Sequence, residues 1–327
     1  MAGRLKKRRV SATLRSGKRL NVPAWEIDSG RPGAVLLVMA AQHGNEVQGS
    51  EVVRRFVEVA TDSIQEGKVF GVPFANPAAV RERRPHISMN PEQAYSDHRG
   101  HNMNRTWPGR ADGNDTARVS HALHKAFGEE ATHVFDLHCW SKCVAPAVLA
   151  RDVPEVRDLA RKLGHRFVKV SKNNNGGQIS ALFCSTGRIG ITYEFSGQYL
   201  VDEAQVRHGL RLAENMAKSI GILPGTPSRP HRPVLFLDET ETVQVKAPRS
   251  GLFTTVGLEL CGKVREGELL GHLLSEATLG HTEIKAPVSG YLSTYGVRRP
   301  HGDVSLAAQH PFAVKGELLA TIVKANG

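Results

Sequence analysis

The segment Ala34-Val35-Leu36-Leu37-Val38-Met39-Ala40, followed by His43-Gly44-Asn45-Glu46, decides how the rest of the chain is interpreted. An unbroken apolar run that ends at a glycine turn is typical of a strand buried on both faces of a sheet. Such strands occur in α/β proteins, where helices cover the sheet on both sides. His43 and Glu46 therefore follow directly on the end of a buried strand.

Up to about Gly225, the chain on either side of this segment alternates between apolar runs and helical patterns. Further strands are expected over 69–74, 133–138 and 188–195, and helices over 51–64, 154–163 and 201–220. The apolar residues of 51–64 recur at helical spacing, and Gly164 and Gly221 end the later helices. This alternation predicts an α/β fold, with a mixed sheet flanked by helices.

The sequence pattern changes at the turn-rich linker Pro224–Pro230, after which apolar residues no longer recur at helical spacing. Val245-Lys246-Ala247-Pro248-Arg249-Ser250-Gly251-Leu252 recurs as Ile284-Lys285-Ala286-Pro287-Val288-Ser289-Gly290-Tyr291. The repeat predicts a smaller, pseudo-symmetric all-β domain, similar to the biotinyl/lipoyl-type sandwich. The stretch 275–281 between the halves lacks the lysine that a carrier domain would modify. We therefore expect a catalytic α/β domain over 1–225 and a β-sandwich without a carrier function over 231–327.

Composition excludes several classes of protein. The chain has 327 residues, 40% of them hydrophobic, and no apolar run approaches the ~18 residues of a membrane helix. The basic start at 6–9 is not followed by an apolar segment, so we expect no membrane association and a cytoplasmic location. The net charge of +11 is spread along the chain without an aromatic-interleaved stripe. We expect small anionic molecules rather than nucleic acid as partners.

The cysteines indicate neither a disulfide framework nor a structural zinc site. Four of them are scattered along the chain, too few for a disulfide framework. Cys139 and Cys143 are four residues apart, but no second Cys or His pair accompanies them to complete a structural zinc site. We interpret all four as reduced side chains.

Residues that suit a metal stand where the expected strands end. His43 and Glu46 follow 34–40, His138 ends 133–138, and in open α/β sheets ligands gather at the carboxyl ends of strands. Imidazole nitrogen and carboxylate oxygen both suit Zn²⁺, and two histidines with one glutamate leave a position for water. Asp136, on the same side of its strand as His138, could orient that imidazole. The pattern predicts a catalytic zinc site, although each motif alone recurs by chance.

Glu194 lies in the apolar segment 190–195, where burying a carboxylate is costly without a partner or a function. It is either half of a buried ion pair or a general base beside the metal. Two basic segments, Arg81–Arg84 and Asn104-Arg105, lie between the first and second groups. An arginine fork could hold a substrate carboxylate, and a solvated basic loop is the alternative.

His43-Gly-Asn-Glu46, Asn76-Pro77, Asn104-Arg105, Asp136-Leu137-His138 and Glu194 resemble, in this order, the motifs of the succinylglutamate desuccinylase/aspartoacylase family. That family belongs to the wider zinc carboxypeptidase superfamily, so a zinc-carboxypeptidase-like sheet is expected. The resemblance covers about residues 30 to 220. The C-terminal β-domain also looks like the one that this family carries.

The resemblance implies a role for each residue. His43, Glu46 and His138 would be the ligands of one Zn²⁺, and Glu194 would activate water. Asn104 and Arg105 would bind the substrate carboxylate. The oxyanion-stabilising arginine would be Arg84, ahead of Arg81 or Arg83. Ala78 and Asn102 depart from the arginine and the acid of some relatives, which leaves the acyl group and the amino acid open.

The expected activity is hydrolysis of the amide bond of a small, carboxylate-bearing N-acyl amino acid. Two alternatives stay open: a zinc carboxypeptidase that trims peptides, and a catalytically silent binding module. The sequence also leaves open whether the chain forms a homo-oligomer.

Overall fold

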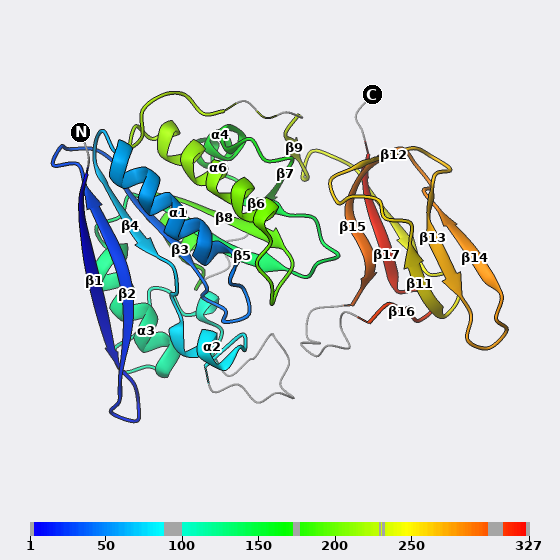
Figure 1. The fold of residues 1–327 in the computed structure, drawn as a ribbon, viewed down its shortest axis with the longest axis horizontal. Helices are drawn as coiled ribbons and strands as arrows, with labels where there is room; N and C mark the ends of the chain where they lie inside the picture. Colours follow the sequence, from blue (N-terminus) through cyan, green and yellow to red (C-terminus); the bar gives the residue numbers. More distant parts are fainter. Residues whose placement is uncertain are drawn as a thin grey trace.

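A computed structural model describes residues 3–87, 100–172, 177–228, 230, 233–299 and 310–324. Within these segments the chain forms one nine-stranded mixed sheet and two four-stranded antiparallel sheets. Figure 1 shows the large sheet with its helices beside the two small sheets. This arrangement confirms the predicted fold class, a mixed α/β sheet flanked by helices with a C-terminal all-β part.

The nine strands of the large sheet follow the order β1-β2-β4-β3-β5-β8-β6-β7-β9. Strands β3, β4, β5 and β8 run parallel to one another, whereas β6 is antiparallel to β8. The bounds are β1 Arg4–Thr13, β2 Arg19–Asp28, β3 Val35–Ala40, β4 Lys68–Val72, β5 His133–Trp140, β6 Ala147–Arg151, β7 Phe167–Ser171, β8 Ile189–Ser196 and β9 Leu235–Phe236.

Helices cover both faces of this sheet (Figure 1). One face packs against α1 (Gln48–Ser63), α4 (Pro154–Leu163) and α6 (Glu203–Ser219), and its core includes Phe56, which is fully buried. The other face packs against α3 (Asp115–Leu123), the π-helical turn η2 (His124–Gly128) and α5 (Ile179–Ser185). The short α2 (Pro77–Glu82) and η1 (Met103–Arg105) stand near the carboxyl ends of the central strands.

The expected strands and helices are present with small shifts of their ends. Helix α4 has the bounds expected from its proline and glycine, and Gly164 ends it with a left-handed φ of 76°. The sequence did not predict the β1–β2 hairpin. The basic residues 6–9 lie in β1, an edge strand whose partly exposed charged side chains discourage pairing with other chains.

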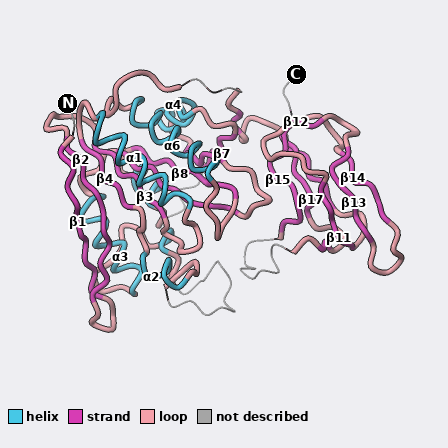
Figure 2. Tube along the Cα trace, in the orientation of Figure 1, coloured by secondary structure: helices cyan, strands magenta, loops and turns pink. Residues whose placement is uncertain are grey.

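The C-terminal strands form a sandwich with internal two-fold order. One sheet has the order β10-β17-β15-β12 and the other β14-β13-β11-β16. Adding four to β10 and β12, and subtracting four from β17 and β15, converts the first order into the second. The repeated sequence supplies β10 with β11 and β14 with β15. In Figure 2 the described chain from residue 242 onward is drawn as strands and loops. The bounds are β10 Thr242–Lys246, β11 Gly251–Thr255, β12 Lys263–Val264, β13 Leu269–Leu274, β14 His281–Lys285, β15 Gly290–Arg298, β16 Phe312–Ala313 and β17 Leu318–Lys324.

Backbone pairing joins the sandwich to the large sheet. After β5 the chain passes along β15, where Ala145 N–H donates to the carbonyl oxygen of Ser293 at 2.9 Å and Tyr295 N–H donates to that of Cys143 at 2.8 Å. A buried cluster of Ala145, Ala147, Phe167 and Val323 fills the contact. The β5–β6 connection thus acts as an additional short strand of the sandwich.

The domain boundaries 1–225 and 231–327 remain a prediction, and residue 229 of the expected linker and residues 231 and 232 after it lie outside the described segments. Strand β9, which follows the linker, pairs with β7 of the large sheet. We therefore propose that the sandwich begins after Phe236, at the approach to β10. No helix in the described segments is long and apolar enough to span a membrane.

Candidate metal centre and active site

The turn after β3 places the first candidate ligands. Ala41 adopts a left-handed φ of 53°, and the chain then turns through His43 and Glu46 before α1 begins. Gly44 is required here, because a Cβ atom would lie 2.1 Å from the carbonyl carbon of Ala79 and 2.4 Å from the carbonyl oxygen of Arg84. The turn is therefore packed directly onto the segment that contains α2.

His43, Glu46 and His138 come together as a buried group. The Glu46 carboxylate lies between the imidazoles, with Oε1 3.1 Å from His43 Nδ1 and Oε2 2.8 Å from His138 Nδ1. The three candidate ligand atoms all lie within 4.8 Å of one another. No other cluster of this kind occurs among the described residues, so Cys139 and Cys143 take part in none there.

Hydrogen-bond partners orient both imidazoles. Burial lowers the pKa of His138, but the carboxylates of Asp136 and Glu46 outweigh it and raise this pKa well above its usual value. His138 Nε2 lies 2.9 Å from Asp136 Oδ2, as expected from the sequence, and His43 Nε2 lies 3.0 Å from Asn102 Oδ1. Both partners are acceptors, because Asn102 Oδ1 also accepts from the backbone N–H of Asn104. In the neutral tautomers each Nε2 carries the proton, so each Nδ1 directs a lone pair toward the Glu46 carboxylate.

Lone pairs that converge on a carboxylate are repelled by it unless a proton or a metal cation lies between them. The donor set of two imidazole nitrogens and one carboxylate, with a hydrogen-bonded outer partner on each histidine, therefore fits Zn²⁺. The two outer partners differ in charge, since Asp136 is a carboxylate and Asn102 is a neutral amide.

Glu194 faces this group from the adjacent strand. In the parallel β5–β8 pair it stands opposite His138. It is 8% exposed, and its Oε2 has no hydrogen-bond partner in the described segments. Burial, reinforced by the carboxylates of Glu46 and Asp136 and opposed by His138 and Lys169, raises the pKa of Glu194 to about 8. Because Glu194 forms no ion pair with an arginine or lysine of the described segments, its geometry favours the general base over the buried ion pair.

The candidate substrate residues lie on two segments that contact the His43 turn, one through Asn102 and the other through Pro85. Asn104 is buried, and its Oδ1 has no partner among the described residues. Arg105 is exposed and donates from Nη1 to the Asn104 carbonyl at 2.7 Å. Arg84 is half-buried, whereas Arg81 and Arg83 are exposed, and Gly44 N–H donates to the carbonyl of Pro85 next to it at 3.3 Å. Of the three arginines, Arg84 is therefore nearest in sequence to Pro85, whose carbonyl contacts the turn that contains His43.

The family model described as the succinylglutamate desuccinylase/aspartoacylase catalytic domain matches residues 32–220, which is more than half of the chain. The chain belongs to this family. The predicted resemblance is therefore confirmed, and the matched residues include His43, Glu46, His138 and Glu194.

Solved structures of the desuccinylase/aspartoacylase family share the fold over nearly the whole chain. An aspartoacylase family protein from Mesorhizobium loti is 19% identical with a TM-score of 0.72, covering 100% of both chains. A succinylglutamate desuccinylase/aspartoacylase from Rhodobacter sphaeroides is 18% identical with a TM-score of 0.71, covering 100% of this chain and 97% of the other. The product-bound ectoine utilization protein EutE (DoeB) from Ruegeria pomeroyi is 18% identical with a TM-score of 0.72, covering 99% and 96%. Comparison with curated proteins gave no match.

In this member of the family, Gln42 connects the candidate metal site to the segment that carries the candidate substrate residues Asn104 and Arg105. Its Nε2 donates to both carboxylate oxygens of Asp136 at 2.8 Å, and its Oε1 accepts from Trp107 Nε1 at 2.8 Å. Gln42 is fully buried. Because Trp107 follows Arg105 closely, one amide holds both the partner of His138 and the segment that carries the candidate substrate residues.

We expect Gln42→Leu to lower the affinity for zinc by about 10–100-fold, because Asp136 would lose the donor that orients it toward His138. Gln48→Leu is the matched control. Gln48 is another fully buried amide, but its Nε2 donates to the carbonyls of Ser196 and Gly197 and not to Asp136. Each variant should lose about 1–3 kcal/mol of unfolding free energy. Chelator competition would measure the affinity, and equal affinities in the two variants would refute the proposed role.

Sequence reasoning missed Gln42 and the role of Asn102, which it noted only as a departure from relatives. Tyr193 belongs to the core on the opposite face of β8 from Glu194, with Cys139.

Proposed function

We propose that this protein is a zinc-dependent amidohydrolase that cleaves small N-acyl amino acids. The observation that supports this most directly is the Glu46 carboxylate between two imidazole Nδ1 atoms, with the carboxylate of Glu194 in register beside them. Membership of the desuccinylase/aspartoacylase family supports the same class of reaction.

His43, Glu46 and His138 would hold the metal. A bound Zn²⁺ supplies a Lewis acid and lowers the pKa of water toward about 7. Glu194 accepts a proton from the attacking water and later delivers it to the departing amine. Glu194 would keep its base form populated near neutral pH, because a positive charge held by the candidate ligands would counteract the effect of burial.

Binding and orientation are assigned to the loops. Arg105, whose guanidinium is exposed, would hold the carboxylate of the substrate, and Asn104 would donate to it from its side-chain NH₂ group. Arg84 would donate hydrogen bonds to the oxygen that gains negative charge as the amide carbonyl is attacked. The acyl group and the amino acid are not specified by these contacts.

We expect the purified protein to contain about one zinc per chain and to release amine from at least one N-acyl amino acid. Elemental analysis and a panel of acetyl, succinyl and other acyl amino acids would measure both on the same preparation. A panel of peptides tests the carboxypeptidase alternative. Protein that contains no zinc and stays inactive after zinc is added back would instead identify a binding module.

A further inference from the structure

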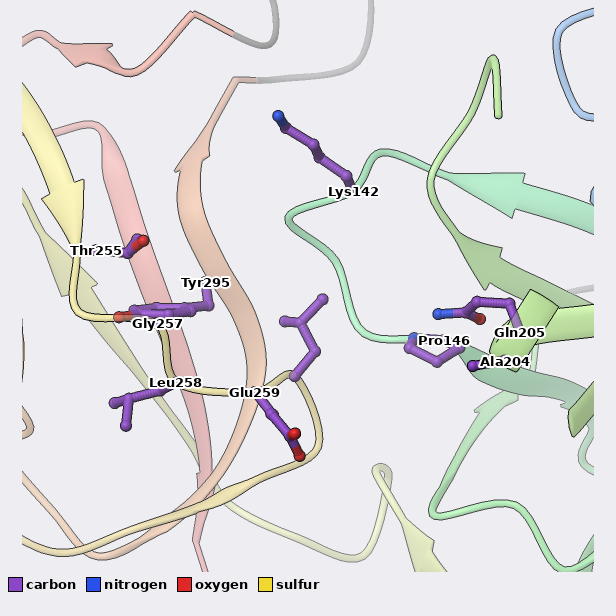
Figure 3. A pocket seen from close by; sticks show the side chains of 10 residues that line it. Lys142, Pro146, Ala204, Gln205, Thr255, Gly257, Leu258, Glu259 and Tyr295 are labelled. Carbon is purple, nitrogen blue, oxygen red and sulfur yellow. The ribbon is translucent and has the colours of Figure 1, made fainter. Parts of the chain in front are cut away.

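A second cleft lies on the other face of β8, between the large sheet and the sandwich. Two adjoining cavities of about 600 Å³ and 470 Å³ share the walls Pro146, Ala204, Gln205, Glu259 and Leu260. Figure 3 shows the larger one, with Gln205 and Pro146 on one side and Glu259 and Leu258 on the other. Because Tyr193 lines the smaller cavity and points away from Glu194, this cleft is separate from the candidate active site.

The inner wall contains a buried hydroxyl without a partner. Tyr193 is fully buried, and its Oη forms no hydrogen bond with the described residues. Its ring packs edge-on against His165 and Phe195, which holds it in place. A buried hydroxyl that stays unpaired destabilises the fold, so such groups are usually satisfied by a ligand or by water.

A chain of hydrogen bonds beside Tyr193 uses all the imidazole nitrogens. Arg211 Nη2 donates to His208 Nδ1 at 2.8 Å, so His208 carries its proton on Nε2. That proton is donated to His165 Nδ1 at 2.7 Å, and His165 Nε2 donates to the Pro146 carbonyl at 2.7 Å. Burial lowers the pKa of His208 to about 3 and that of His165 to about 4, so both are neutral.

The charged groups of the smaller cavity include Arg211, Arg166 and the exposed Asp202. Arg166 donates to the carbonyl of Pro233 and stacks on the ring of Tyr291. Arg211 forms no ion pair with the described parts of the chain, and it donates a side-chain hydrogen bond to His208. Because the lone pairs of both histidines are already used, the inner wall offers donors: the remaining guanidinium N–H groups and the Tyr193 hydroxyl. The carboxylate of Glu259 is exposed and stands farther out, at the part shared by both cavities.

We propose that this cleft is a second ligand site, which binds a small carboxylate-bearing molecule through Arg211 and the Tyr193 hydroxyl. A planar guanidinium suits a planar carboxylate, and Pro146 and Leu260 provide apolar walls for a carbon skeleton. The ligand would contact α6 and β8 on one side and the loop 259–261 of the sandwich on the other. The site is independent of the metal and of the proposed hydrolysis.

Isothermal titration calorimetry of the zinc-loaded protein with acetate, glycine and inorganic phosphate would test the proposal. We expect a carboxylate, acetate or glycine, to bind, and both Tyr193→Phe and Arg211→Met to weaken this binding roughly tenfold or more. Arg207→Met is the control, because Arg207 lies on the same helix but is exposed and pairs with Glu203. Binding at the candidate active site would persist in all three variants.

Thermal unfolding separates loss of the ligand from loss of the fold. Tyr193→Phe keeps the ring contacts and removes an unpaired hydroxyl, so without ligand it should be at least as stable as the unchanged protein. The carboxylate should raise the melting temperature of the unchanged protein and of Arg207→Met more than that of Tyr193→Phe. Binding of phosphate alone, or carboxylate binding that none of the variants alters, would overturn the proposal.

Discussion

Glu194→Gln is expected to lower turnover by about 10²–10⁴-fold while zinc remains bound. The amide has nearly the shape of the carboxylate, but it cannot accept a proton from water. Glu194 is not one of the three clustered candidate ligands, so the metal content should not change. Steady-state rates and elemental analysis on the same preparation would measure both effects.

The control for this variant is Glu203→Gln, a change of the same kind at an exposed residue of α6 that pairs with Arg55. It should leave both turnover and zinc content unchanged. Turnover of Glu194→Gln close to that of the unchanged protein would remove Glu194 from the mechanism. A joint loss of zinc and turnover would make Glu194 a ligand instead of a base.

His138→Ala and His43→Ala should both abolish zinc binding and turnover, but they should differ in the stability of the zinc-free protein. His138 lies between Glu46 and Asp136, which are both buried carboxylates. Removing it leaves two buried charges without their shared partner, at a cost of about 3–5 kcal/mol. The outer partner of His43 is the neutral Asn102, so His43→Ala should cost clearly less.

Urea unfolding in the presence of a chelator would measure the two free energies, with zinc content determined before the chelator is added. Equal losses of stability in the two variants would show that Asp136 and Glu46 do not depend on His138. Retention of zinc in either variant would remove that histidine from the ligand set.

The sequence predicted those parts of the fold in which local pattern and tertiary structure agree. Helix α4 begins with a proline and ends at Gly164, and the buried strand β3 is apolar along its length. The hairpin of β1 and β2 was missed because the partly exposed basic side chains of β1 hide its alternation. The short β6 and α5 were missed because 5 and 7 residues are too few to show a clear strand or helix period.

The residues of the candidate site could likewise be predicted only in part. His43, Glu46, His138 and Glu194 could be proposed because each follows or lies within a recognisable strand. Gln42 could not, since its partners are 65 and 94 residues away and an amide beside a histidine carries no pattern of its own. The repeat likewise predicted a two-fold sandwich, but not that the connection after β5 would pair with it.

That connection bears on how freely the two parts of this protein can be separated. The chain that leaves His138 is hydrogen-bonded along β15 within a few residues, and the same contact buries Ala145 and Ala147 against Val323. A fragment cut at Phe236 would expose this apolar surface and leave the carbonyl of Cys143 and the amide of Ala145 without their partners. The α/β part therefore depends on contacts with the sandwich. If it were expressed alone or fused to another protein, the segment next to its own candidate ligands would be disturbed.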